Sequence, residues 1–199
     1  MSFFPGKLDR FEIILASKSP RRQQLLKDLG IQFKVITKEV EETFPVHLKR
    51  EEVALHLALK KANAYKEILH QDNVIVITAD TIVCLEEKII GKPVDFNDAV
   101  YILKTLSGKM HEVFTSVCIS RKEKKELFFV RSEVYFKSFS EDEIHFYLEH
   151  YKPYDKAGAY GIQDWIGLTG IEKINGSYHN IMGLPVKEVY EHLLDISNK

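Results

Sequence analysis

The stretch that decides the fold is Leu15-Ala16-Ser17-Lys18-Ser19-Pro20-Arg21-Arg22. Apolar residues run into it and predict a short strand that ends in a polar turn. Ser19 is a good N-cap and Pro20 suits the first helical position, so the turn opens a helix. Arg21 and Arg22 fall in its first turn, where the helix dipole disfavours cations. The pattern predicts a phosphate site of N–H and guanidinium groups; the plain alternative is a capped helix with solvated arginines.

Composition limits the classes of protein to which the chain can belong. Its 199 residues, 45% of them hydrophobic and 29% charged, are typical of one large domain or two small lobes. A net charge of -1 provides no field to recruit nucleic acid or an anionic membrane. Cys84 and Cys118 lie in apolar runs without metal-ligand spacing, which predicts buried free thiols in a reducing, cytoplasmic setting. Residues 1–12 resemble neither a signal peptide nor a membrane span.

A carboxylate follows the most apolar run of the chain. Residues 74–79 predict a central strand that is buried on both faces, and Asp80 comes directly after it. Ligands of open α/β sheets gather at the carboxyl ends of strands, and a buried unpaired carboxylate is costly. Asp80 is therefore predicted to serve catalysis or metal binding, with a structural turn as the alternative.

Two lysines are placed to reach a cleft. Apolar spacing predicts a helix over about residues 50–69, and it puts Lys61 on the apolar stripe. Such a lysine either snorkels to the rim or carries its charge into a cleft, and the small neighbours Ala58 and Ala64 favour the cleft. Lys92 follows a predicted hairpin and is held between a glycine and a proline, which makes a rigid mount.

Two further segments carry polar groups. Residues 31–36 predict a strand, and the acidic patch after them is either a solvated loop or, beside a phosphate site, a holder of Mg²⁺. Residues 155–163 combine two glycines and two alanines with charges, which allows backbone to approach a ligand closely. Gln163 ends that segment with both a donor and an acceptor, a pairing that suits the edge of uracil or thymine.

The remaining pattern is regular. Helices are predicted over residues 20–29, 95–106 and 140–150, the last with a capping box at Ser140 and Glu143, and a closing helix begins near Pro185. Strands are predicted over residues 111–120 and 127–136, and a hairpin over residues 81–90. The charged residues 121–126 read as a solvated turn.

Taken in order, these motifs carry a resemblance over nearly the whole chain. Leu-Ala-Ser-x-Ser-Pro-Arg-Arg, Ala-Asp-Thr, Gly-Lys-Pro, Leu-Ser-Gly, Asp-Lys-Ala-Gly-Ala-Tyr-Gly-Ile-Gln, Asn-Gly-Ser-Tyr and Gly-Leu-Pro resemble the Maf family of nucleoside triphosphate pyrophosphatases. The resemblance implies an α/β fold shared with the inosine triphosphate pyrophosphatases, in which a long mixed central sheet flanked by helices separates two lobes around a nucleotide cleft. It also implies a single domain over residues 1–199, a divalent metal cation (Mg²⁺ or Mn²⁺) and a homodimer.

The resemblance also assigns roles to matching residues. It implies that Asp80 is the catalytic acidic residue, that Glu42 (or its neighbour Glu41) shares a metal with it, and that Lys61 and Lys92 complete the catalytic cleft. Substrate binding and specificity would fall to five further residues: Ser17, Arg21, Arg22, Thr81 and Gln163. At Arg21, Thr81 and Gln163 the chain resembles the subgroup that acts on dTTP and UTP.

Other functions stay open on the sequence. A pyrophosphatase of the 7-methyl-GTP type is one alternative, and a nucleotide-sensing cell-division regulator without significant catalysis is another. A phosphatase that releases orthophosphate is a third, because only product analysis separates it from an enzyme that cuts at the α-phosphate. Nucleic-acid binding is disfavoured, since the chain has no basic stripe.

Overall fold

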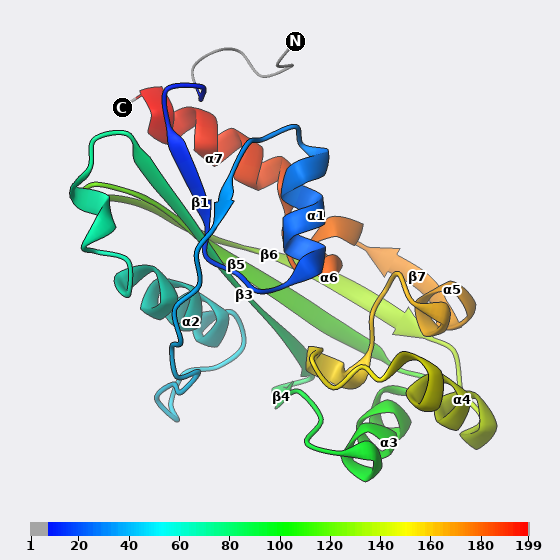
Figure 1. Cartoon of the computed structure of the whole chain (residues 1–199). Helices are drawn as coiled ribbons and strands as arrows, with labels where there is room; N and C mark the ends of the chain where they lie inside the picture. Colours follow the sequence, from blue (N-terminus) through cyan, green and yellow to red (C-terminus); the bar gives the residue numbers. More distant parts are fainter. Residues whose placement is uncertain (1–7, 199) are drawn as a thin grey trace.

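One seven-stranded mixed sheet runs through the protein. The computed structural model describes residues 8–198, with strand order β2-β1-β3-β5-β6-β7 and β4 paired to β3 (Figure 1). The strands are β1 Glu12–Leu15, β2 Lys34–Val35, β3 Val74–Leu85, β4 Lys88–Ile90, β5 Met110–Arg121, β6 Lys124–Phe136 and β7 Ile171–Asn175. The helices are α1 Pro20–Asp28, α2 Glu51–Asn63, α3 Phe96–Leu106, α4 Glu141–Tyr151, α5 Trp165–Gly170, α6 Tyr178–Met182 and α7 Val186–Asn198, with 3₁₀ turns η1 Ile68–His70 and η2 Ala157–Ala159.

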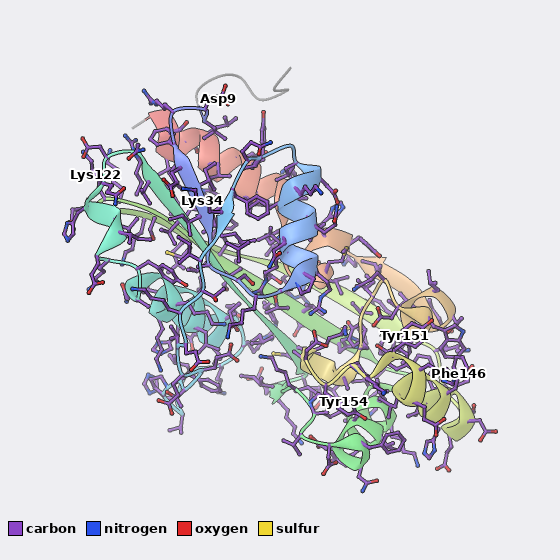
Figure 2. The ribbon with its side chains drawn as sticks, in the orientation of Figure 1. Asp9, Lys34, Lys122, Phe146, Tyr151 and Tyr154 are labelled. Carbon is purple, nitrogen blue, oxygen red and sulfur yellow. The ribbon has the colours of Figure 1, made fainter. Side chains whose placement is uncertain are left out.

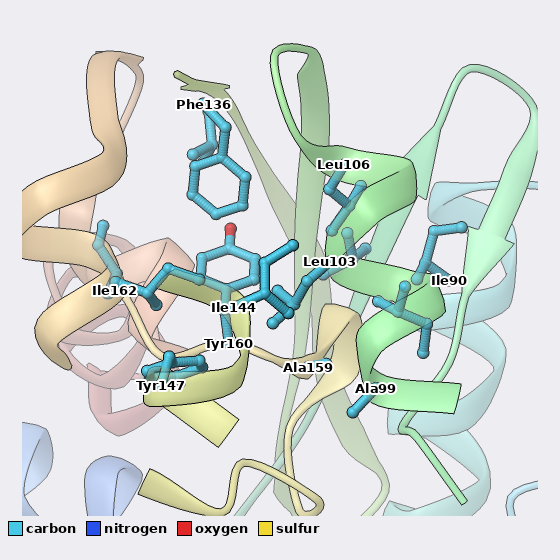
Figure 3. Packing of buried hydrophobic residues seen from close by; sticks show 14 of the residues in the cluster. Ile90, Ala99, Leu103, Leu106, Phe136, Ile144, Tyr147, Ala159, Tyr160 and Ile162 are labelled. Carbon is cyan, nitrogen blue, oxygen red and sulfur yellow. The ribbon is translucent and has the colours of Figure 1, made fainter. Parts of the chain in front are cut away.

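The helices cover the sheet unequally and create two lobes. Helix α2 packs on one face, where its Val53 and Leu57 contact Ile82 and Phe114. On the other face, α1 and α7 cover one end of the sheet and form the first lobe, while α3, α4, α5 and η2 pack together at the other end and form the second lobe (Figures 1 and 3). The predicted architecture, a long mixed sheet flanked by helices in two lobes, is confirmed.

The central strand is longer than the sequence predicts. Asp80 does not end it: β3 continues to Leu85, and the pairing with β5 is unbroken from Val76 opposite Ser120 to Cys84 opposite Glu112. The antiparallel pairing with β5 supplies backbone hydrogen bonds on both sides of Asp80, so the strand continues past this residue. Asp80 therefore sits in the middle of a rigid strand.

Two predicted elements are shorter than expected. Helix α2 ends at Asn63 instead of Leu69, because the chain tightens into i→i+3 hydrogen bonds around Tyr65. The buried Tyr65 hydroxyl accepts the Lys38 N–H at 2.8 Å and donates to the Ile36 carbonyl at 2.9 Å, which ties this turn to a distant loop. The strand predicted over residues 31–36 shrinks to Lys34–Val35, since its edge pairs with β1 over only two residues.

Other local predictions are confirmed. Ser19 caps α1, with Pro20 at its start. Ser140 and Glu143 form the capping box of α4, and α3 begins after its N-cap Asp95. The hairpin of β3 and β4 and the long pair β5–β6 also form, although the turn of that pair is narrower than residues 121–126 and lies at Lys122.

The surface of the second lobe carries aromatic side chains. Phe146, Tyr151 and Tyr154 are 42%, 41% and 36% exposed and lie on the outer side of α4 and the turn after it (Figure 2). The sequence predicts that residues 1–12 form neither a signal peptide nor a membrane span, and residues 1–7 of this segment lie outside the described residues. Among residues 8–198, none of the helices has the length and apolar character needed to cross a bilayer.

Candidate active site

A cavity of about 1080 Å³ opens between the two lobes at the middle of β3. The pairing of β1 with β3 stops at Leu15 opposite Ile77, and the pairing of β4 with β3 covers only Val83 to Leu85. The stretch of β3 between these partners has an open backbone edge. Asp80 and Thr81 lie on it, and because successive strand residues point to opposite faces, one side chain faces α2 and the other faces α1 and α6.

The structure brings all the predicted site residues to this one cavity. They come from five separate parts of the chain, namely the β1–α1 turn with the first turn of α1, the loop before α2, α2 itself, β3 with the residues that follow β4, and the segment after η2. The residues are Ser17, Arg21, Arg22, Glu42, Lys61, Asp80, Thr81, Lys92 and Gln163.

Charged side chains form one part of the cavity lining, which we call the charged end (Arg21, Glu42, Lys61, Asp80 and Lys92). The Lys61 Nζ lies 2.5 Å from the Asp80 Oδ1 and 2.8 Å from the Glu42 Oε1, and the Lys92 Nζ lies 3.1 Å from the Glu42 Oε2. Asp80 is only 6% exposed. The carboxylate that joins the lysines is thus Glu42 and not Glu41.

Small residues allow this convergence. Ala58 and Ala62 of α2 are fully buried against the sheet, and the Ala58 carbonyl accepts a hydrogen bond of 2.8 Å from the Thr78 hydroxyl of β3. A helix that approaches the sheet so closely brings Lys61 within reach of Asp80. Partial burial alone would raise the pKa of Glu42, but the ammonium groups of Lys61 and Lys92 outweigh it and lower the pKa to about 2.

Arg22 points into the protein. Its Nε donates to the Gly183 carbonyl at 2.7 Å, its Nη1 to the Ala79 carbonyl at 2.9 Å and its Nη2 to the Thr81 hydroxyl at 3.0 Å. Burial lowers the pKa of this guanidinium, while Asp80 opposes that shift. Arg22 therefore clamps α1 to the open edge of β3 and to the end of α6, where Gly183 adopts a φ of 110° that favours glycine.

Its neighbour Arg21 is the arginine that reaches the cavity rim. The Arg21 Nη1 lies 3.1 Å from the Asp155 Oδ2, across the gap between the first lobe and the segment before η2. Asp155 also accepts from the Lys156 Nζ at 2.8 Å. The two arginines, predicted as equal phosphate ligands, thus have different surroundings. The contacts of Asp155 and Lys156 with each other and with Arg21 had no signal in the sequence beyond the glycine-rich segment around them.

An apolar part of the cavity lining, which we call the apolar end, consists of Ile90, Ala157, Tyr160, Ile162 and Ile181 together with the polar Gln163. The Gln163 Oε1 is buried and has no hydrogen-bond partner among the described residues. The Thr81 hydroxyl lines the same cavity but is already engaged, because it accepts from Arg22 and lies 2.9 Å from the Thr115 hydroxyl, which donates to the Asn180 carbonyl. Gln163 thus has a free acceptor, while Thr81 supports Arg22.

Comparisons with known proteins show the family and the relatives to which this chain is similar. The model of a family described as Maf-like protein matches residues 12–196. A dTTP/UTP pyrophosphatase of Bacteroides fragilis strain YCH46 is 47% identical over 94% of this chain and 97% of its own, and one of Phocaeicola vulgatus is 49% identical over 94% and 96%.

Among solved structures, the Staphylococcus aureus Ham1 protein resembles the fold, with a TM-score of 0.50 and 15% identity over 92% of this chain and 98% of that one. A likeness at this identity concerns the fold alone. The motifs occur in order along the chain, their polar residues line one cavity, and the family model matches residues 12–196. The chain belongs to the Maf-like protein family.

Proposed function

We propose that the protein is a nucleoside triphosphate pyrophosphatase that hydrolyses dTTP and UTP to the monophosphate and pyrophosphate. One observation carries the proposal: a single cavity is lined both by a cluster of cations and by Gln163, whose buried amide oxygen has no hydrogen-bond partner among the described residues. A triphosphate needs the first and a base edge needs the second. The names of the relatives, dTTP/UTP pyrophosphatases, support the same substrate class.

The charged end suits attack of water on the α-phosphorus. The new P–O bond forms as the bond to the β-phosphate oxygen breaks, and pyrophosphate leaves with the electron pair. Arg21, Lys61 and Lys92 supply positive charge where the leaving group gains negative charge. Asp80 is the proposed catalytic carboxylate, which accepts the proton that the water loses, and Glu42 orients the water or the lysines.

The two carboxylates also fit a divalent cation. Asp80 and Glu42 offer the hard oxygen donors that Mg²⁺ and Mn²⁺ prefer. Within residues 8–198 no set of three or more His, Cys, Asp and Glu side chains is grouped to hold a metal, so oxygens of the substrate would complete the coordination, as is usual for Mg²⁺. When bound, the cation would polarise phosphoryl oxygens and spread the charge of the leaving group.

Base choice is assigned to the apolar end. The free Gln163 oxygen can accept the N3–H of uracil or thymine, and the amide N–H can donate to a carbonyl of the same base. Cytosine presents an unprotonated nitrogen at that position, and a purine adds a second ring. A site with buried polar groups disfavours a wrong edge because its own groups are left unpaired.

A panel of nucleotides with both products quantified tests this function. Purified protein with Mg²⁺ should release pyrophosphate and monophosphate from UTP and dTTP at least about tenfold more efficiently than from CTP or GTP. Orthophosphate as the product would identify a phosphatase, and a preference for 7-methyl-GTP would move the chain to that subgroup. Binding without either product would leave a nucleotide sensor.

Assembly and setting complete the proposal. We infer a homodimer, on the basis of the family resemblance and of the exposed aromatic side chains Phe146, Tyr151 and Tyr154, which offer an apolar surface to a second copy (Figure 2). Light scattering at two protein concentrations measures this directly. We also infer a single domain that works in the cytoplasm, in line with two buried free cysteines and a sheet shared by both lobes.

A further inference from the structure

Gln163 lies in a tight turn that the rest of the second lobe holds from behind. The Asp164 N–H donates to the Gly161 carbonyl at 3.0 Å, so residues 161–164 form a β-turn with Ile162 and Gln163 at its centre. The direction of the Gln163 side chain therefore depends on the two residues at the ends of the turn.

A buried tyrosine joins those two ends. The Tyr147 hydroxyl of α4 accepts the Gly161 N–H at 3.1 Å and donates to the Asp164 Oδ2 at 2.9 Å. The Tyr147 ring is fully buried beside Ile162 (Figure 3). Burial and the nearby Asp164 raise the pKa of Tyr147, so its hydroxyl remains a donor. The turn is thus closed twice, once by backbone and once through this hydroxyl.

The carboxylate of Asp164 accepts the hydrogen bond from Tyr147 and does not cap α5. Asp164 is the N-cap residue of α5, a position where aspartate ordinarily accepts a backbone N–H of the first turn. Here its side chain makes no capping hydrogen bond and turns instead to Tyr147. It lies so close to Gly161 that a Cβ at that glycine would collide with it. The Lys156 Nζ, 4.0 Å away, balances its charge.

We propose that Tyr147 and Asp164 are positioning residues for base selection: they hold the turn 161–164, and with it the place of the Gln163 side chain in the cavity lining. The inference rests on the proposed function, since it assigns the geometry of the same site. Neither residue touches the base. We call the Tyr147 hydroxyl with its two hydrogen bonds, to Gly161 and Asp164, the tyrosine clamp. If this clamp is lost, the Gln163 amide samples other directions. The preference for uracil and thymine then falls while the charged end stays unchanged.

The test compares two tyrosine hydroxyls that each donate to a carboxylate. Tyr147→Phe removes the bridge between Gly161 and Asp164, whereas Tyr135→Phe removes a β6 hydroxyl that donates to the Glu133 Oε2 at 2.8 Å and belongs to a residue outside the lining of the cavity. The catalytic efficiency for UTP relative to CTP should fall about fivefold or more in Tyr147→Phe, mainly through KM. It should stay within about twofold of the original protein in Tyr135→Phe.

A conservative variant separates positioning from stability. Asp164→Asn retains an oxygen that accepts from Tyr147 and should keep the selectivity, whereas Asp164→Ala should lose it as Tyr147→Phe does. A Tyr147→Phe protein with unchanged selectivity, or an Asp164→Ala protein as selective as Asp164→Asn, would overturn the inference. Asp164→Ala also serves if Tyr147→Phe does not fold.

A second readout needs no turnover. The side-chain amide protons of Gln163, assigned in NMR spectra with Gln163→Ala, should give one sharp pair in the original protein and in Tyr135→Phe. They should shift and broaden in Tyr147→Phe. An unchanged pair of Gln163 amide signals in Tyr147→Phe would contradict the proposed role of Tyr147, whether or not the protein hydrolyses UTP. Absence of pyrophosphate release with the predicted NMR result would instead overturn the proposed function alone.

Discussion

At the charged end of the cavity, side chains from distant segments meet one another directly, whereas at the apolar end one short loop is shaped by groups behind it. Lys61 alone connects α2, β3 and the loop that carries Glu42. The Gln163 Oε1 has no hydrogen-bond partner among residues 8–198, and the placement of this side chain depends on the buried neighbours of its turn. The difference implies that single substitutions at the charged end should affect turnover, while those at the apolar end should affect selectivity.

The largest effect is expected at Asp80. Asp80→Asn keeps the size and the strand position of the side chain but removes the charge beside Lys61. Turnover of UTP should fall about a hundredfold or more, the scale of losing a positioned acid–base group. Pyrophosphate release measures it, with circular dichroism to confirm the fold. Near-normal turnover in a folded variant would remove Asp80 from the mechanism.

Acid should lower the free energy of unfolding through His111, which lies buried in the second lobe. Burial lowers the pKa of His111 to about 3, so the folded protein keeps this ring neutral where an unfolded chain, with a pKa near 6.5, takes up a proton. The unfolded state then binds more protons, and the free energy of unfolding should decrease as pH falls below about 6.5, by about 1.4 kcal/mol per pH unit.

Urea unfolding at several pH values measures this slope. His111→Gln retains a partner for the Tyr160 hydroxyl but cannot titrate, so its profile between pH 6.5 and pH 5 should be flatter by about 2 kcal/mol in total. Parallel profiles for the two proteins would show that His111 does not cause the acid sensitivity.

A smaller effect is expected at Lys61. Lys61→Ala removes the only cation that touches both Asp80 and Glu42 among the described residues, and the catalytic efficiency for UTP should drop about tenfold. Lys66→Ala is the matched control, because it removes the same charge from an exposed position just beyond α2. Lys60 is a poorer control, since it holds Thr43 next to Glu42. Equal losses at Lys61 and Lys66 would mean that only overall charge matters.

The smallest effect is expected at the apolar end. Gln163→Ala should lower the preference for UTP over CTP about fivefold, with little change in the turnover of CTP, because only the preferred base loses a hydrogen bond. Efficiencies for the two nucleotides measured side by side decide this. A uniform loss for both would place Gln163 in general binding and would weaken the contrast between the two ends.

Local sequence signals were reliable where one residue determines its own surroundings. Ser19 and Pro20 begin a helix as predicted, because a cap depends on residues that are adjacent in the chain. The apolar run before Asp80 forms a buried strand. The helix phase also placed Lys61 correctly, because side chains three and four residues apart share one face. The resemblance then collected the site residues, including Glu42, which has no distinctive local pattern.

Features that depend on partners were not predictable in the same way. The length of β3 beyond Asp80 comes from its ladder with β5, and the end of α2 comes from the Tyr65 hydroxyl and its contacts with residues 36 and 38. The division of labour between Arg21 and Arg22 depends on where the Gly183 and Ala79 carbonyls lie. Such atoms are close in space but far apart along the chain.

The sequence by itself determined the fold class, the family and the set of residues in the cavity, because periodicity, caps and ordered motifs are local or additive signals. Only the tertiary structure decided which of those residues are free to meet a ligand and which are occupied by the protein. Arg22 and Thr81 are hydrogen-bonded to each other, the Gln163 Oε1 has no partner in the described part of the chain, and Tyr147 and Asp164 become relevant through their contacts. The physical reason is that a hydrogen bond depends on the distance between two atoms, and folding alone sets that distance for residues far apart in the chain.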